Sequence, residues 1–109
     1  MPWLLRDGEV LASLEVAENW RSRSNGLLGR HGIEGAILLR PARAVHTLGM
    51  KFPIDVAFLD GDLTVIRVVS MRRWRVGRPV MRARAVLEAE RGAFRDWELR
   101  PGDKLEIKE

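Results

Sequence analysis

The feature that most constrains the fold of this chain is a pair of Asp-Gly turns between short apolar segments. Asp60-Gly61-Asp62 separates residues 54–59 from residues 63–69, and Asp7-Gly8 precedes residues 10–16. In residues 54–58 and 10–16, apolar and less apolar positions alternate with the period of two that is typical of β-strands. Asp-Gly favours the tight turn of a hairpin. The sequence therefore predicts antiparallel β-hairpins.

Further strands are expected from the remaining apolar segments, and Pro53 interrupts one of them because proline cannot donate to a strand ladder. The complete set of expected strands is 3–5, 10–16, 36–39, 45–50, 54–59, 63–69, 84–90 and 104–107. Two short helices are expected near residues 19–29 and 92–99, the first between Asn19 as N-cap and Gly29 as helix stop. Closure of the sheet would remove its edges. We therefore expect an α+β fold: a curved, partly closed, barrel-like, mainly antiparallel sheet with two short helices.

Length and composition indicate one globular domain over residues 1–109. The chain has 46% hydrophobic and 31% charged residues, close to the globular average. It has no cysteine, which excludes disulfides, thiolate metal sites and a cysteine nucleophile. It contains no run of eighteen apolar residues and no secretory signal, so we expect a cytoplasmic protein without a membrane segment.

The positive charge is local. The net charge is +4, yet residues 63–87 contain seven arginines and no acidic residue, whereas the rest of the chain has 12 basic and 15 acidic residues. An aromatic side chain among cations is a common arrangement for holding single-stranded nucleic acid. The candidate polyanion-binding residues are Arg72, Arg73, Trp74, Arg75, Arg78, Arg82 and Arg84, with Arg67 nearby. The alternative is a solvated hairpin in which Trp74 packs on the core.

The segment VHTLGMKFPIDVAFLD, residues 45–60, is the most distinctive motif. Together with Arg23, the stretch Gly26-Leu27-Leu28-Gly29-Arg30, Val86-Leu87-Glu88 and Gly102-Asp103, it resembles the bacterial and archaeal family known as domain-of-unknown-function family 192. The resemblance covers most of the chain and implies a compact α+β domain. The family has no agreed catalytic residues, so the resemblance assigns none.

A candidate ligand pocket surrounds this motif, with His46, Met50, Asp55 and Asp60 as its residues. An imidazole beside a carboxylate is a common general-base arrangement. The alternative is that His46 is a hydrogen-bonded structural residue and Asp55 a turn or edge partner. His31 and His46 lack the spacing of metal ligands, and phosphate-loop and dinucleotide fingerprints are absent, so we expect no metal and no cofactor.

Two functions from different classes follow. In the first, the domain is a non-enzymatic binding module that uses its arginine-rich face, with weak binding of polyanions or nucleic acid. In the second, it is a small hydrolase-like or ligand-binding protein with a pocket around His46, Met50 and Asp55. Convergence of His46 and Asp55 in a cleft would favour the second function; an exposed arginine face beside a solidly packed motif would favour the first. Whether the protein is an enzyme stays open at this level.

Overall fold

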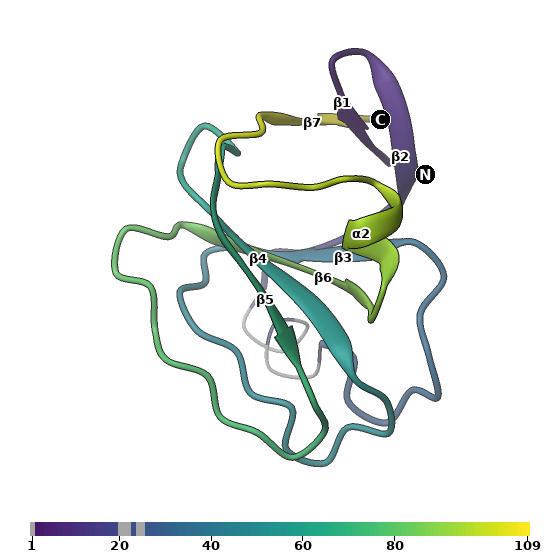
Figure 1. Cartoon of the computed structure of the whole chain (residues 1–109), viewed down its shortest axis with the longest axis vertical. Helices are drawn as coiled ribbons and strands as arrows, with labels where there is room; N and C mark the ends of the chain where they lie inside the picture. Colours follow the sequence, from purple (N-terminus) through teal and green to yellow (C-terminus); the bar gives the residue numbers. More distant parts are fainter. Residues whose placement is uncertain (1, 20–22, 24–25) are drawn as a thin grey trace.

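The computed structural model describes residues 2–19, 23 and 26–109, and these residues form a mostly β structure (Figure 1). One seven-stranded sheet has the order β5-β4-β6-β3-β2-β1-β7. The described elements are β1 (Trp3–Arg6), β2 (Glu9–Ala17), β3 (Ala36–Leu39), β4 (Ile54–Leu59), β5 (Val65–Met71), β6 (Ala85–Glu90), α2 (Ala93–Asp96) and β7 (Leu105–Lys108).

Both predicted hairpins are confirmed. β1 pairs antiparallel with β2, and β4 pairs antiparallel with β5. At the first turn Asp7 and Gly8 have φ angles of 53° and 79°. Positive φ at both central residues defines the type I′ turn, whose twist matches that of paired strands. The Asp-Gly signal therefore acts locally, as expected.

One strand pair departs from the antiparallel prediction, because β2 and β3 run parallel. Parallel neighbours need a long crossover connection, and residues 18–35 provide it. Gly35, with φ of 79°, ends this crossover where a Cβ atom would collide with the backbone and hydroxyl of Ser13. Glycine is thus required where the crossover meets β2.

The expectation of an α+β fold with two short helices is confirmed only in part, because the described residues are mostly β. Of the predicted helix at 92–99 only α2 forms, and Glu98 with φ of 52° has already left the helical conformation. Five residues of the predicted helix at 19–29, namely 20–22 and 24–25, lie outside the described residues; Arg23 is helical, and residues 26–29 form turns. The described part of the chain is therefore mostly β.

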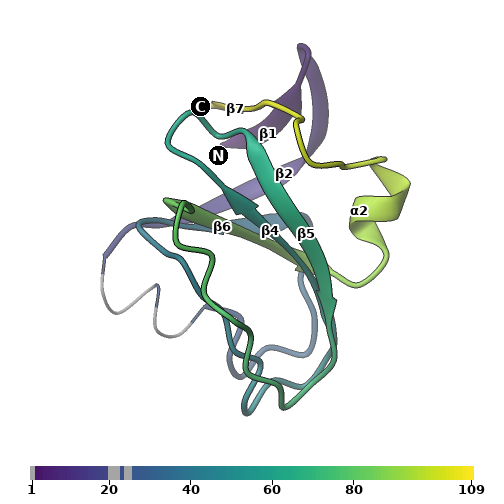
Figure 2. The ribbon, with the colours of Figure 1, turned by 60° about the vertical axis from the view of Figure 1, so that its left-hand side comes forward.

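The sheet is also not a closed barrel. Its edge strands are β5 and β7, and their ends approach each other at one bridge between Thr64 and Lys104. Both termini lie near β1 and β7 at this end of the molecule, and the long connections lie at the other end (Figures 1 and 2). No helix within the described ranges is long and apolar enough to cross a membrane.

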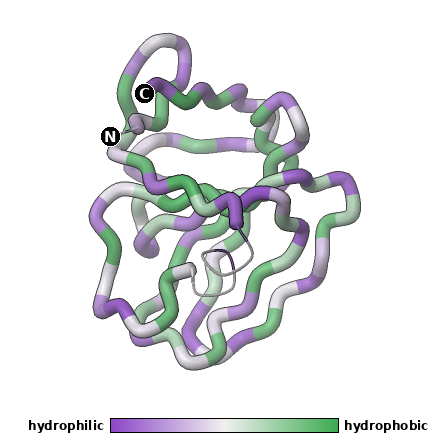
Figure 3. Tube along the Cα trace, turned by 180° about the vertical axis from the view of Figure 1, so that it is seen from behind, coloured by the Kyte–Doolittle hydropathy of each residue, from purple (hydrophilic) through white to green (hydrophobic). Residues whose placement is uncertain are grey.

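The central strands β4, β6 and β3 are buried on both faces. On one face, the side chains of Leu59 and Leu87 pack with Phe94, which comes from α2. On the other face, Ile54 and Val86 pack with residues from the long connections. Hydrophobic residues recur along these connections as well as along strands (Figure 3). A polar side chain on a central strand is therefore buried whichever face it points to.

The connections 40–53 and 72–84 run beside each other and are joined by backbone hydrogen bonds (Figures 1 and 2). Gly77 N donates to Val45 O at 3.0 Å, and Val80 N donates to Arg43 O at 2.9 Å. The strand predicted at 45–50 is reduced to one bridge between His46 and Val76. The candidate site residues His46, Met50 and Arg72 to Arg84 described below lie on this irregular pair of connections.

Candidate functional site

The turn Arg72–Arg75 is held in place by Thr47, which is fully buried. The Thr47 hydroxyl donates to Arg72 O at 2.6 Å and accepts from Arg75 N at 2.9 Å. The Thr47 backbone donates to Arg75 O at 2.8 Å and accepts from Trp74 N at 3.0 Å. One buried residue of the facing connection thus bonds four backbone N–H and C=O groups of the turn.

Trp74 lies at the tip of this turn and is 62% exposed. Its φ angle of 61° is unusual for a bulky residue, because the left-handed region suits glycine best. The structure therefore does not pack Trp74 on the core, which was the alternative to a binding role. An exposed indole on a fixed backbone can stack on a flat ligand.

A groove of about 400 Å³ adjoins the turn and is lined by arginine, tryptophan and proline only. We call it the arginine groove; its residues are Pro53, Arg72, Arg73, Trp74, Arg75 and Arg91. Among the described residues, the ion pairs involve Arg6, Arg30 and Arg40, so no groove arginine is neutralised by a carboxylate. The groove therefore offers unpaired guanidinium groups beside an aromatic ring.

The other predicted arginines are dispersed. Arg67 and Arg78 line a neighbouring depression of about 490 Å³ together with Arg72 and Arg75. Arg84 precedes β6, at the opposite end of the central strands from Arg72, as the register between Leu59 and Ala85 shows. Arg82 is exposed and lines neither depression. The predicted basic face is thus concentrated around residues 72–78.

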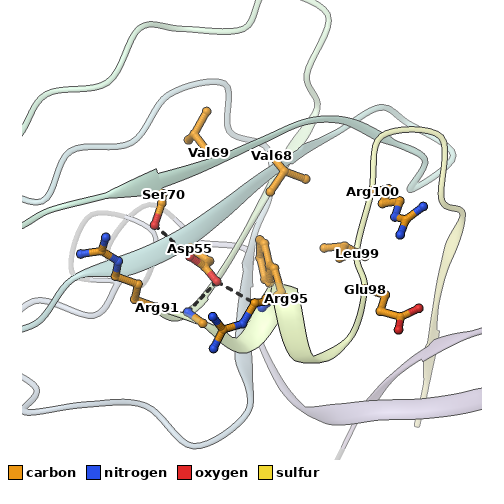
Figure 4. A pocket seen from close by; sticks show the side chains of 11 residues that line it. Asp55, Val68, Val69, Ser70, Arg91, Arg95, Glu98, Leu99 and Arg100 are labelled. Carbon is orange, nitrogen blue, oxygen red and sulfur yellow. Dashed lines mark hydrogen bonds between the residues drawn. The ribbon is translucent and has the colours of Figure 1, made fainter.

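Asp55 is buried, with 7% exposure, and acts as an anchor for α2 (Figure 4). Its carboxylate accepts from the Ser70 hydroxyl at 3.1 Å, from Gly92 N at 2.9 Å and from Phe94 N at 3.1 Å. These donors include backbone groups that the start of a helix leaves without intrahelical partners. Asp55 therefore has a structural position that no local sequence signal revealed.

Asp60 has a local role as well. Its Oδ1 accepts from the backbone N–H groups of Asp62 at 2.9 Å and Thr64 at 3.0 Å. An aspartate that bonds the backbone two residues ahead shapes a tight turn. Neither Asp55 nor Asp60 joins His46.

His46 and Met50 do share a cavity, and the carboxylate that lines it with them is Glu88. The cavity measures about 290 Å³. His46 is exposed, and its Nδ1 accepts from Leu48 N at 3.2 Å, whereas Met50 is buried. Glu88 is only 5% exposed, and burial raises its pKa to about 7. The cavity thus brings together the imidazole of His46 and the thioether of Met50, and the carboxylate beside them is that of Glu88 rather than Asp55.

The family model DUF192, described as "Uncharacterized ACR", matches residues 4–107. The chain belongs to the DUF192 family. Curated relatives carry the name UPF0127 protein. One from Pyrococcus abyssi is 32% identical over 98 residues, which cover 85% of this chain and 84% of the relative. Another relative, from Pyrococcus horikoshii, is 29% identical over 104 residues, which cover 91% of this chain and 87% of the relative.

Two solved structures share the DUF192 fold seen here. A Novosphingobium aromaticivorans protein of unknown function superposes with a TM-score of 0.79 at 21% identity, covering 96% of this chain and 83% of its own. A Sinorhizobium meliloti protein, for which a role in transcription regulation has been suggested, superposes with a TM-score of 0.82 at 19% identity. The superposition covers 97% of this chain and 91% of that protein. These likenesses show that both proteins share the fold of this chain, whereas the predicted family is confirmed by the family model.

Sequence reasoning placed Glu88 in the family's Val-Leu-Glu strand but not in a site. A signal was present, because Glu88 is the one acidic residue within the apolar run Ala85–Ala89. Continuous apolar runs mark strands buried on both faces, where a carboxylate is desolvated. For Thr47 no such signal existed, since its partners lie 25 and 28 residues away.

Proposed function

We propose that this DUF192 protein is a binding module that holds single-stranded nucleic acid weakly, and without base specificity, in the arginine groove. One observation carries the proposal: unpaired arginines surround a tryptophan that is 62% exposed and set on a turn fixed by Thr47. Guanidinium groups bind phosphates through two parallel hydrogen bonds. Aromatic rings stack on any base, since every base has a π-face.

The geometry around His46 supports this function over a hydrolase-like one. The hydrolase hypothesis needs His46 and Asp55 in one cleft, and Asp55 instead bonds Ser70 and the start of α2 on the other face of the sheet. Nothing in the arginine groove is a nucleophile or a general base. A groove of cations and one aromatic ring binds its ligand without transforming it.

The test is a fluorescence-anisotropy titration of labelled single-stranded DNA and RNA at two salt concentrations. Binding through phosphates releases counterions, so log affinity falls with log salt by about 0.7 for each phosphate contacted on a single strand. Three or four contacts in the arginine groove predict a slope of roughly −2 to −3.

Two double variants with the same change in charge separate the groove from general basicity. Arg73→Glu with Arg75→Glu removes two groove cations and is expected to abolish measurable binding. Arg82→Glu with Arg84→Glu, outside the groove, should leave most of the affinity. Equal losses in both variants, or no salt-dependent binding by the unmodified protein, would contradict the proposal.

A further inference from the structure

Glu88 is an ionisable residue that the arginine groove does not use. It lies on β6, in the middle of the sheet, between β4 and β3. Its strand neighbours in register are Ile37 on β3 and Val56 on β4, both buried and apolar. The carboxyl group is therefore flanked by hydrocarbon on both sides.

No described residue gives the Glu88 carboxylate a hydrogen bond or an ion pair. Burial alone shifts its pKa, upward to about 7. A buried charged group without a partner is rare in proteins, because desolvation is uncompensated. No oxygen of Glu88 is sealed in the core, so the carboxylate meets the cavity that it lines.

The walls of this cavity are largely apolar and include Leu27, Leu28, Leu39, Val45 and Met50. Its volume of about 290 Å³ is just below the usual range for drug-sized ligands, which begins at about 300 Å³, and suits a smaller molecule. An apolar pocket with one convergent polar group is the usual form of such a site.

Two further ionisable side chains line the cavity, and both have other partners. The Arg23 guanidinium donates to Glu18 O at 3.4 Å. His46 accepts a backbone N–H at Nδ1, so its ring proton is carried by Nε2. Neither residue is hydrogen-bonded to Glu88, so the carboxylate in the cavity has no partner among the described residues.

We propose that the cavity in front of Glu88 binds a small aliphatic ammonium ion, with the charged head on the carboxylate and the carbon chain against the apolar walls. An ammonium group carries three donors and the opposite charge, which together compensate the desolvation of Glu88. This site is independent of the arginine groove: it uses other residues and takes a ligand of opposite charge.

The probe is n-butylammonium chloride, with 1-butanol and sodium butanoate as neutral and anionic analogues of similar size. Amide resonances of Leu28, His46 and Met50 would be followed by NMR at pH 8, where Glu88 is ionised. We expect n-butylammonium to bind at least tenfold more tightly than 1-butanol, and butanoate not to bind. Equal affinity for n-butylammonium and 1-butanol, or preference for butanoate, would overturn the proposal.

Glu88→Gln keeps the shape of the side chain and removes its charge, so n-butylammonium should then bind no better than 1-butanol. Glu90→Gln, two residues along the same strand and exposed, is the matched control and should keep the preference. A preference that survives in Glu88→Gln would contradict the assignment.

In the unmodified protein, saturation with n-butylammonium should lower the pKa of Glu88, read from its side-chain carbonyl resonance, by at least one unit. An unchanged pKa would equally refute the proposal, whatever the stability of the variant.

Discussion

Two buried carboxylates on neighbouring central strands differ in their hydrogen bonding, because they point to opposite faces of the sheet. Asp55 faces α2, where the start of a helix and Ser70 supply three donors. Glu88 faces the long connections, where no described donor reaches it. Burial is similar for both residues, at 7% and 5% exposure. The number of donors therefore separates a structural anchor from a candidate binding group.

The buried Glu88 makes stability depend on pH in a defined direction. Its pKa is about 7 in the folded protein against a usual value of 4.5, so between these values the folded state holds a proton that the unfolded state releases. Stability contributed by this group is therefore complete below pH 4.5 and is lost as the pH rises to 7 and above. One pKa unit corresponds to about 1.4 kcal/mol, so the loss is roughly 3 kcal/mol.

Glu88→Gln should remove this dependence. Urea unfolding from pH 4 to pH 8 is expected to show the variant gaining roughly 3 kcal/mol relative to the unmodified protein over this range. Glu90→Gln, on the exposed end of β6, should leave the pH profile unchanged. A constant difference between the Glu88 variant and the unmodified protein at all pH values would refute a raised pKa.

At the scale of elements, the long connections act as a pair because Thr47 joins them. Its hydroxyl bonds two backbone groups of the turn Arg72–Arg75, the carbonyl of Arg72 and the N–H of Arg75. A buried backbone group that loses its partner costs about 1–3 kcal/mol. The turn is thus a fixed element rather than a solvated loop.

Thr47→Val keeps the shape of the side chain but removes the hydroxyl, and should lower the free energy of unfolding by about 1–3 kcal/mol. It should also weaken single-strand binding, because Arg72 and Arg75 lose their fixed positions. Thr47→Ser retains both hydrogen bonds and should lose only about 1 kcal/mol, from the deleted methyl group. Urea unfolding and anisotropy measure the two effects. Equal stability of the valine and serine variants would show that the hydroxyl is dispensable.

The elements that sequence reasoning predicted are those defined by local signals. Asp7-Gly8 and Asp60-Gly61 fix their hairpins through neighbours only. The parallel pairing of β2 with β3 depends on a crossover of residues 18–35, and no residue in either strand encodes it. The same holds for the pairing of residues 40–53 with 72–84, on which both candidate sites depend.

The candidate pocket residues are likewise predicted from their proximity in the sequence. His46 and Met50 are close in the sequence, and the structure places both in one cavity. Asp55 was grouped with them for the same reason, yet strand alternation and the order of the sheet turn it to the opposite face. Only the tertiary arrangement brings Glu88 to the cavity and Arg91 to the groove.

In the whole molecule, the apolar core and the excess positive charge lie in different parts of the chain. The sheet buries its apolar residues on two faces, and the positive excess is carried by the connection that follows edge strand β5. Outside residues 63–87 acidic residues outnumber basic ones, by 15 to 12. A polyanion should therefore be drawn to one region of the surface rather than to the molecule as a whole.

The most direct test of nucleic-acid binding is the affinity of Trp74→Gly for single-stranded DNA. Glycine suits the φ angle of 61°, and the side chain it removes is exposed, so the thermal midpoint should stay the same or rise. If Trp74 stacks on bases, affinity should fall by about 1–3 kcal/mol, roughly 5- to 150-fold. An affinity equal to that of the unmodified protein would contradict a stacking role and, with it, the account of the arginine groove.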